Sequence, residues 1–114
     1  MSIGLVPLRN YGAIDAGKEI YRSAQPMYNY EFKWMRDVLG IEYIINLRAE
    51  SNHSYLGRKY GINVINIRVK DHHPPTLKQA QRFISLIRSL NKPILIHCEH
   101  GHGRTSTFSV LAKI

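Results

Sequence analysis

Residues 93–106, with the sequence PILIHCEHGHGRTS, contain the side chains best suited to chemistry in this chain. Cys98 and Arg104 are separated by five residues, and Thr105 and Ser106 provide a helix start. The pattern predicts a short buried strand, then a glycine-containing loop, then a helix. Such a loop directs several backbone N–H groups toward one point, and the positive end of the helix dipole makes that point attractive to anions.

The cysteine of this loop is predicted to be a nucleophile, because backbone amides, a helix dipole and a guanidinium all lower the pKa of a thiol. Phosphate fits the predicted site best, since its oxygens can accept hydrogen bonds from the loop amides and from a planar guanidinium together. We expect unusual φ values and close approach to the ligand at Gly101 and Gly103. The predicted phosphate-binding residues are Glu99, His100, Gly101, His102, Gly103 and Arg104.

Cys98 and Arg104 suit phosphoryl transfer through a covalent phosphocysteine. The thiolate would attack phosphorus while the loop amides and Arg104 hold the other oxygens. The departing ester oxygen requires a proton, and Asp71, in a loop after the preceding strand, is the best candidate acid and later the base that activates water. A turn or helix-start role is the alternative for Asp71. Glu50 is its rival, with a surface position or an ion pair to Arg48 as the alternative.

Two residues beside the nucleophile are assigned supporting roles. Thr105 can donate its hydroxyl to the thiolate and so help sulfur leave in the second step, or it can cap the final helix, and the two roles are compatible. By strand alternation, His97 points away from Cys98. We expect His97 to hydrogen-bond to the loop backbone and fix its shape, with simple core packing as the alternative.

The remaining histidines are predicted to lie around the site rather than to react. His100 and His102 are expected at the pocket rim, where they can meet the substrate, and His72 and His73 are expected to solvate the acid loop rather than to catalyse. A metal site is disfavoured, because alternate residues of a tight turn rarely converge on one ion. Its ligands would have to be His97, Cys98, His100 and His102. We therefore expect no metal and no cofactor.

Composition limits the class of protein. The chain has 114 residues, 44% of them apolar, which fits one domain. Its single cysteine excludes an internal disulfide and fits a reducing compartment. No segment approaches the ~20 apolar residues of a membrane span, and the N-terminus has no secretory pattern, so we expect a soluble, cytoplasmic protein without a membrane span. The net charge of +8 favours phosphorylated substrates, whereas the scattered basic residues give no support for nucleic acid.

Alternating apolar segments predict an α/β domain with a central, largely parallel sheet flanked by helices. Residues 1–18 are expected to be irregular and residues 71–75, DHHPP, to form a loop. Strands are expected at residues 19–22, 41–47, 62–69 and 93–97. Helices are expected at residues 29–39 with Asn29 as cap, 51–60, 76–90 with Thr76 as cap, and from Thr105 onward. In parallel sheets ligands bind beyond the carboxyl ends of the strands, where Cys98 falls.

The final predicted helix has more apolar surface than a helix at the end of a domain normally leaves uncovered. Its apolar residues are Phe108, Val110, Leu111 and Ile114. We expect that helices following Ile114 cover this surface, or that another chain covers it. Residues 1–114 are therefore expected to form a single domain that is incomplete at its C-terminus.

The loop HCEHGHGRTS resembles the H-C-x5-R-[ST] loop of the cysteine-dependent protein tyrosine phosphatase superfamily. YRSAQP at residues 21–26 and INLRAE at residues 45–50 are similar to segments of its atypical, plant-and-fungal-like dual-specificity branch, and DHHPP resembles the acid loop of the tensin-type lipid phosphatases. The resemblance implies a dual-specificity phosphatase fold and a phosphatase catalytic domain. It also implies the catalytic residues Cys98, Arg104, Asp71 and Thr105.

The resemblance further implies hydrolysis of phosphate monoesters, either in phosphoproteins (tyrosine, and also serine or threonine) or in inositol phosphates and phosphoinositides. Lipid-directed members carry Lys where His102 stands and often a basic residue near Glu99, which disfavours a phosphoinositide substrate here. A catalytically silent phosphate-binding module is an alternative of another class, although it needs neither nucleophile nor acid. A redox-sensing thiol protein would need a resolving cysteine, and the sequence has no second cysteine.

Overall fold

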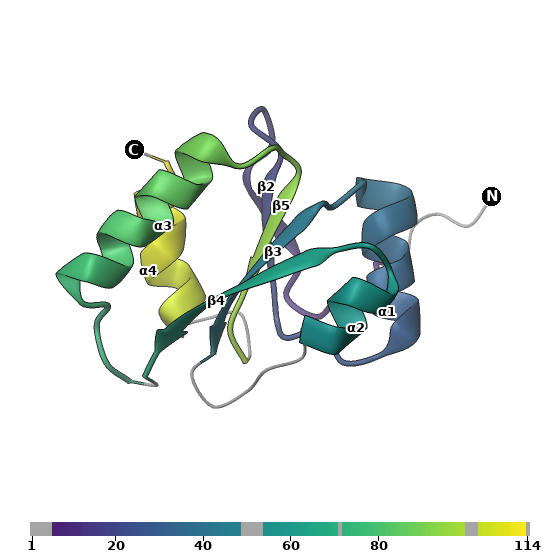
Figure 1. The fold of residues 1–114 in the computed structure, drawn as a ribbon, viewed down its shortest axis with the longest axis horizontal. Coiled ribbons are helices and arrows are strands. Elements are labelled where there is room, and N and C mark those ends of the chain that lie inside the picture. The colour runs from purple at the N-terminus through teal and green to yellow at the C-terminus, as the bar shows by residue number, and fades with distance from the viewer. Residues whose placement is uncertain (1–5, 49–53, 71, 100–102, 114) are drawn as a thin grey trace.

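The computed structural model describes residues 6–48, 54–70, 72–99 and 103–113. They form a five-stranded sheet with strand order β1-β2-β5-β3-β4, and helices lie on both faces of the sheet (Figure 1). The strands are β1 (Gly12–Asp15), β2 (Ile20–Ser23), β3 (Tyr43–Arg48), β4 (Asn63–Val69) and β5 (Ile94–His97). The helical segments are α1 (Asn29–Trp34), the π-helical turn η1 (Met35–Leu39), α2 (Ser54–Lys59), α3 (Leu77–Ser89) and α4 (Gly103–Ala112). The predicted α/β fold is confirmed.

The central strand β5 has the sequence ILIH, and all of its residues are buried, as expected for a parallel strand covered on both faces. It pairs in parallel with β2 on one side and with β3 on the other, and β3 pairs in parallel with β4. Only the β1–β2 pair, among the described strands, is antiparallel. His97 lies opposite both Ser23 and Asn46. The carboxyl ends of β2, β5 and β3 therefore lie side by side.

Alternate residues of β5 pack into two separate cores. Ile94 and Ile96 belong to the cluster that contains the buried residues of α3 and α4, and Cys98 belongs to the same cluster. Leu95 belongs to the other cluster, with the buried residues of α1 and η1. Because side chains of a strand alternate between faces, Cys98 leaves the sheet on the α3–α4 side.

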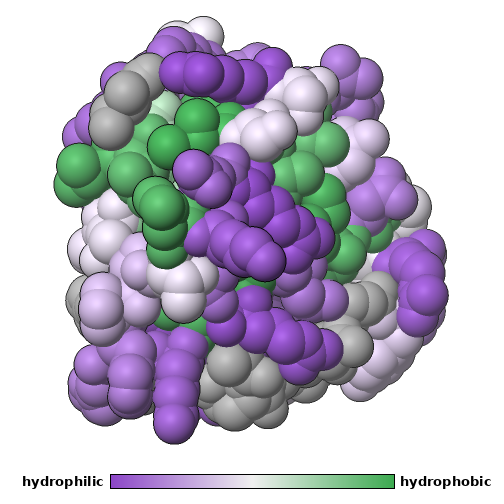
Figure 2. Space-filling view, turned by 60° about the vertical axis from the view of Figure 1, so that its left-hand side comes forward, coloured by the Kyte–Doolittle hydropathy of each residue, from purple (hydrophilic) through white to green (hydrophobic). Residues whose placement is uncertain are grey.

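Helices α3 and α4 contact each other through Phe83 and Phe108, which are both fully buried, with ring centroids 4.7 Å apart and an interplanar angle of 74°. Elsewhere on this side of the molecule, apolar surface reaches solvent between hydrophilic residues (Figure 2). Leu77 and Val110 are 74% and 66% exposed. Val110 is one of the apolar residues that we expect further helices or another chain to cover, and this expectation stays a prediction.

The prediction that residues 1–18 are irregular is wrong for β1. Ile14 is the one buried residue of this four-residue strand at the edge of the sheet. With one inward-facing side chain, β1 has no alternating pattern in the sequence that could reveal it. The turn that follows is closed by the Lys18 N–H, which donates to Asp15 Oδ1 at 3.1 Å.

The two predicted helix caps have different outcomes. Thr76 caps α3 as predicted, because its Oγ1 accepts from the Gln79 N–H at 3.1 Å while Gln79 Oε1 accepts from the Thr76 N–H at 2.9 Å. Asn29 is the first residue of α1 and not its cap. The Glu31 carboxylate instead accepts the Tyr28 N–H at 2.9 Å, so the helix start is satisfied by an acidic residue of its first turn.

The helices also differ from prediction in their bounds. The helix expected over residues 29–39 divides into α1 and the π-helical turn η1, and Gly40, with a φ of 66°, ends it as predicted. Helix α4 begins at Gly103, two residues before the predicted start at Thr105. No helix within the described ranges combines the length and the hydrophobicity that crossing a bilayer requires.

Candidate active site

The sulfur of Cys98 accepts a hydrogen bond from the first turn of α4. Cys98 directly follows β5, and Thr105 Oγ1 donates to its Sγ at 2.9 Å. Both residues are buried, with exposed fractions of 3% and 0%. A hydroxyl that donates to sulfur favours the thiolate over the thiol. The arrangement is therefore suited to hold a negatively charged sulfur at the end of the central strand.

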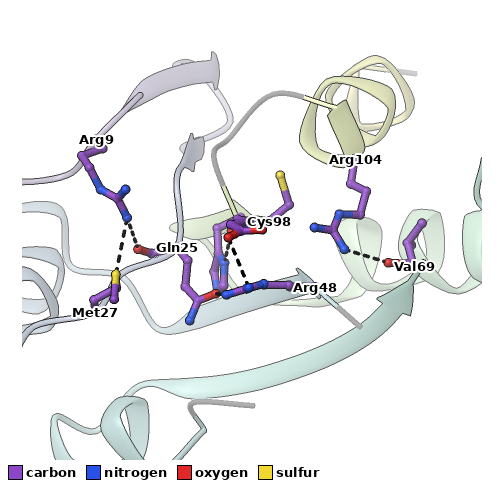
Figure 3. Close-up of polar contacts among 9 residues, drawn as sticks. Arg9, Gln25, Met27, Arg48, Val69, Cys98 and Arg104 are labelled. Atoms are coloured by element: carbon purple, nitrogen blue, oxygen red, sulfur yellow. Dashed lines mark hydrogen bonds and ion pairs between the residues drawn. The ribbon is translucent and has the colours of Figure 1, made fainter. Parts of the chain in front are cut away.

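Arg104 lies beside this thiol and is anchored to a neighbouring strand. It is only 6% exposed, and its Nη1 donates to the carbonyl of Val69, the last residue of β4, at 3.1 Å. Figure 3 shows the Cys98 side chain pointing toward α4, on the side where Arg104 lies. A guanidinium has five N–H donors in a fixed plane. This one can thus keep its strand contact while it presents other donors to an oxyanion.

A cavity of about 620 Å³ opens beside these side chains. The segment of residues 72–75, HHPP, forms part of its wall. His72 and His73 are exposed and line this cavity. The residues that line the cavity include Val69, His72, His73, Cys98, Arg104 and Phe108.

His97 contacts the backbone of the residue that follows it, Cys98. It is 5% exposed, and its Nδ1 lies 3.0 Å from the carbonyl oxygen of Cys98. His97 thus makes the contact with the loop backbone that we expect of it. That its side chain points away from Cys98 stays a prediction.

Several predicted site residues lie outside the described residues. These are the candidate acids Asp71 and Glu50 and the loop residues His100, Gly101 and His102. The alternative metal site depends on two of these histidines. Within the described part of the chain, no three histidine, cysteine, aspartate or glutamate residues gather as a metal site would require.

The prediction of an unusual φ at Gly103 is wrong. Gly103 is the first residue of α4, its φ is not in the left-handed region, and a Cβ built on it would meet nothing within 4 Å. It lines the cavity beside Cys98, as the predicted approach to a ligand requires. At a helix start the backbone already has the ordinary right-handed conformation, so glycine is not required there by backbone geometry.

Arg48 and Gln25 lie next to Glu99, although the sequence suggested only an ion pair with Glu50 for Arg48 and no role for Gln25. Arg48 Nη1 donates to Gln25 Oε1 at 2.7 Å, and its Nη2 lies 3.3 Å from Glu99 Oε1. Gln25 lies in YRSAQP and Arg48 in INLRAE. Both segments were visible as family-like motifs, but nothing in a single sequence indicates that they meet.

The fold is similar to several phosphatases of known structure. The core catalytic domain of the PP-IP phosphatase SIW14 from S. cerevisiae, solved in complex with citrate, aligns with a TM-score of 0.79 and 24% identity over 93% of this chain and 65% of that chain. A putative phosphatase from Shewanella putrefaciens CN-32 aligns with a TM-score of 0.78 and 20% identity over 93% of this chain and 68% of that one. PTPMT1 aligns with a TM-score of 0.71 and 19% identity, over 86% and 67% of the two chains.

This chain thus spans 65% of the length of the SIW14 core. No curated protein sequence matches it. A family model does match, over residues 11–111, and that family is described as a DSP-PTPase phosphatase fused to NAD+ kinase. The matched range runs from the residue before β1 into the last turn of α4 and includes the buried Cys98, Arg104 and Thr105. The chain therefore belongs to this DSP-PTPase family, within the cysteine-dependent protein tyrosine phosphatase superfamily.

Proposed function

We propose that this domain hydrolyses phosphate monoesters through a phosphocysteine intermediate, with protein phosphotyrosine and phosphoserine or phosphothreonine as the leading substrates. One observation carries the proposal: a buried cysteine sulfur accepts a hydrogen bond from Thr105 and lies beside an anchored guanidinium at an open cavity. The similarity to solved structures, at 24% sequence identity for SIW14, supports the fold alone. The family match supports a hydrolase that acts on phosphate esters.

In the proposed first step, the Cys98 thiolate attacks phosphorus. The S–P bond forms as the P–O ester bond opposite to it breaks, and Arg104 and the loop amides hold the three remaining oxygens. The leaving oxygen takes a proton from Asp71. Val69 and His72, on either side of Asp71 in the sequence, both line the cavity, which supports this assignment.

In the second step, water attacks the phosphocysteine. Asp71, now ionised, accepts a proton from the water, the new P–O bond forms and the S–P bond breaks. Sulfur leaves as a thiolate, and the Thr105 hydroxyl stabilises the charge through the hydrogen bond that the structure already contains. Inorganic phosphate is released and the thiolate is ready for another substrate.

Two small-molecule substrate classes are the alternatives. Solved relatives include an inositol pyrophosphate phosphatase and PTPMT1 in complex with PI(5)P, so inositol phosphates and phosphoinositides are the first class. The family description names a fusion to NAD+ kinase, an enzyme whose product carries a 2′-phosphate monoester on the dinucleotide. NADP+ therefore represents the second class.

The decisive experiment measures phosphate release from a panel of phosphopeptides, phosphoinositides, soluble inositol phosphates and NADP+. Turnover of p-nitrophenyl phosphate by the wild-type protein, abolished in Cys98→Ser while phosphate binding is retained, is the expected result. Asp71→Asn should lower kcat more for poor leaving groups than for nitrophenol, and equal losses would remove Asp71 from the acid role. A wild-type protein that binds vanadate tightly without turnover would instead indicate a phosphate-binding module.

We further propose a cytoplasmic setting, since the catalytic thiol must stay reduced.

We also propose that residues 1–114 form one catalytic domain whose α4 surface is covered by further helices or by another chain. The exposed side chain of Val110 in α4 supports this proposal. Binding of a dye for exposed hydrophobic surface, measured beside a thermal melt, tests the proposal. A monomeric, cooperative melt without dye binding would contradict it.

A further inference from the structure

A set of hydrogen bonds links the ends of β2 and β3 to the residue that follows the nucleophile. Arg48, the last residue of β3, donates to Gln25 Oε1 at 2.7 Å and lies 3.3 Å from the Glu99 carboxylate. The Gln25 N–H in turn donates to the Glu99 carbonyl at 3.0 Å. Gln25 is only 3% exposed. In Figure 3, Arg48 and Gln25 lie beneath Cys98, away from its sulfur.

These contacts fix the carbonyl groups of the first two loop residues. His97 Nδ1 lies 3.0 Å from the Cys98 carbonyl, and the Gln25 N–H holds the Glu99 carbonyl. Within one trans peptide unit, the C=O and the following N–H point in opposite directions. A Cys98 carbonyl held by His97 therefore turns the Glu99 N–H to the other side of the chain, which is where an anion-binding loop needs its donors.

The same contacts also govern the charge next to the nucleophile. Glu99 is a carboxylate one residue after Cys98, so its negative charge opposes both a thiolate and an incoming phosphate. The Arg48 guanidinium lies against it, with side-chain exposures of 23% for Arg48 and 40% for Glu99. At this degree of burial, opposite charges are only partly screened by water. The guanidinium therefore offsets the charge that Glu99 brings to the site.

We propose that Arg48 is a positioning residue for the phosphatase reaction: through Gln25 it holds the Glu99 carbonyl, so that the backbone next to Cys98 keeps its orientation, and it offsets the Glu99 carboxylate. This inference rests on the proposed function. It gives YRSAQP and INLRAE a shared role, since each contributes one residue to the support of the loop. Arg48 acts through its neighbours, and Arg104 keeps the direct contact with the substrate.

A positioning role and a merely structural role predict different measurements. Partly exposed ion pairs contribute little to stability, so Arg48→Met should change Tm by only a few degrees. Its effect on the thiol should be larger, because loss of the guanidinium restores the full repulsion by Glu99. We expect the pH profile of Cys98 alkylation by iodoacetamide to move upward by about one unit, which corresponds to roughly tenfold slower alkylation below the thiol pKa.

The charge argument is tested by a second substitution in the same protein. Arg48→Met should also weaken inhibition by inorganic phosphate and lower kcat/KM. Adding Glu99→Gln to Arg48→Met removes the repelling carboxylate and should recover about half of the shift in the alkylation profile and part of these two losses. Arg48→Lys should be intermediate, since a single ammonium can meet Glu99 but cannot also reproduce the planar fork on Gln25. Arg36→Met is the matched control, because Arg36 has an exposed ion pair with Asp37 in η1.

The alkylation profile and inhibition by inorganic phosphate decide the outcome. If Arg48→Met and the double variant both keep the wild-type alkylation profile and the wild-type inhibition constant, the proposal is wrong, whatever happens to Tm. A shift in Arg48→Met with no recovery by Glu99→Gln would reject the charge argument and retain the backbone argument. Because alkylation needs no turnover, a protein without phosphatase activity but with a shifted profile would overturn the proposed function alone.

Discussion

Arg104 and Val69 join the two walls of the cavity through one hydrogen bond. The Arg104 guanidinium, in the first turn of α4, donates to the Val69 carbonyl at the end of β4 at 3.1 Å. The HHPP segment that lines the cavity begins three residues after Val69. The bond thus ties the proposed phosphate-binding guanidinium to the strand end that precedes the proposed acid, Asp71, in the sequence.

Arg104→Lys is expected to lower kcat/KM for p-nitrophenyl phosphate by about 10²-fold, the usual loss when one oxyanion donor is removed. Lysine keeps the positive charge but has no planar fork, so it cannot hold both Val69 and a phosphate oxygen. Steady-state kinetics with the wild type and the variant measure the loss.

Arg82→Lys provides the control for this substitution. Arg82 also donates to a backbone carbonyl of β4, that of Asn66, at 2.9 Å, but it is exposed and does not line the cavity beside Cys98. We expect less than about a twofold change in kcat/KM from this variant, in line with the small effects of surface substitutions. Similar losses in both variants would mean that anchoring of β4, and not phosphate binding, explains the effect.

Thr105→Val should slow the second half of the reaction more than the first. The substitution keeps the shape of the buried side chain and removes the hydroxyl that donates to Cys98 Sγ at 2.9 Å. A hydrogen bond to a charged group contributes about 1.5–3 kcal/mol, so the thiolate should become a poorer leaving group by roughly tenfold or more. A burst of nitrophenol followed by a slow steady state, recorded by stopped-flow absorbance, would show accumulation of phosphocysteine.

Ser106→Ala is the control for the loss of this hydroxyl, because Ser106 is exposed on the same turn of α4. It should show wild-type kinetics without a burst. If Thr105→Val also shows no burst and no change in kcat, Thr105 serves only to pack the first turn of α4; the capping role that the sequence also allowed is wrong, because α4 begins at Gly103.

The contact between the proposed nucleophile and its partners was predictable because these residues lie close together in the sequence. The spacing from Cys98 to Arg104 and the hydroxyl of Thr105 depend on one strand–loop–helix connection, and local rules predict such a connection well. The same holds for the cap at Thr76, where both members of the reciprocal pair lie within three residues.

The contacts behind the loop were not predictable in this way. Arg48 and Gln25 are 23 residues apart in the sequence and meet because β5 lies between β2 and β3 in the sheet. That order depends on which parallel strands become neighbours, and the apolar pattern of each strand does not encode it. The strand β1 was missed for a related reason, since its one buried residue, Ile14, gives no periodic signal.

His97→Ala should raise the pKa of the Cys98 thiol, because the Cys98 carbonyl loses the donor that fixes the first peptide of the loop. His97→Asn should preserve it, since the asparagine amide can donate from nearly the position that Nδ1 occupies in the structure, 3.0 Å from that carbonyl. The pH dependence of alkylation by iodoacetamide measures both variants. Identical profiles for alanine and asparagine would show that packing, rather than the hydrogen bond, is what His97 supplies.

Gly57→Ala is expected to destabilise the domain although alanine is the better helix former. Gly57 is buried in α2, and a Cβ added there would lie 2.5 Å from Val64 Cγ2 and 3.0 Å from the carbonyl oxygen of Ile62. The backbone of the Ile62 carbonyl cannot move aside as a side-chain tip can, so we expect a loss of about 1–3 kcal/mol in the free energy of unfolding. Urea denaturation followed by circular dichroism measures this loss of stability.

Gly17→Ala is the matched control, because a Cβ at residue 17 would meet only Asp15 Oδ1 at an ordinary 3.5 Å. A Gly57→Ala protein as stable as the wild type would mean that α2 shifts away from β4 at little cost, and the close packing of these two elements would then not constrain the fold.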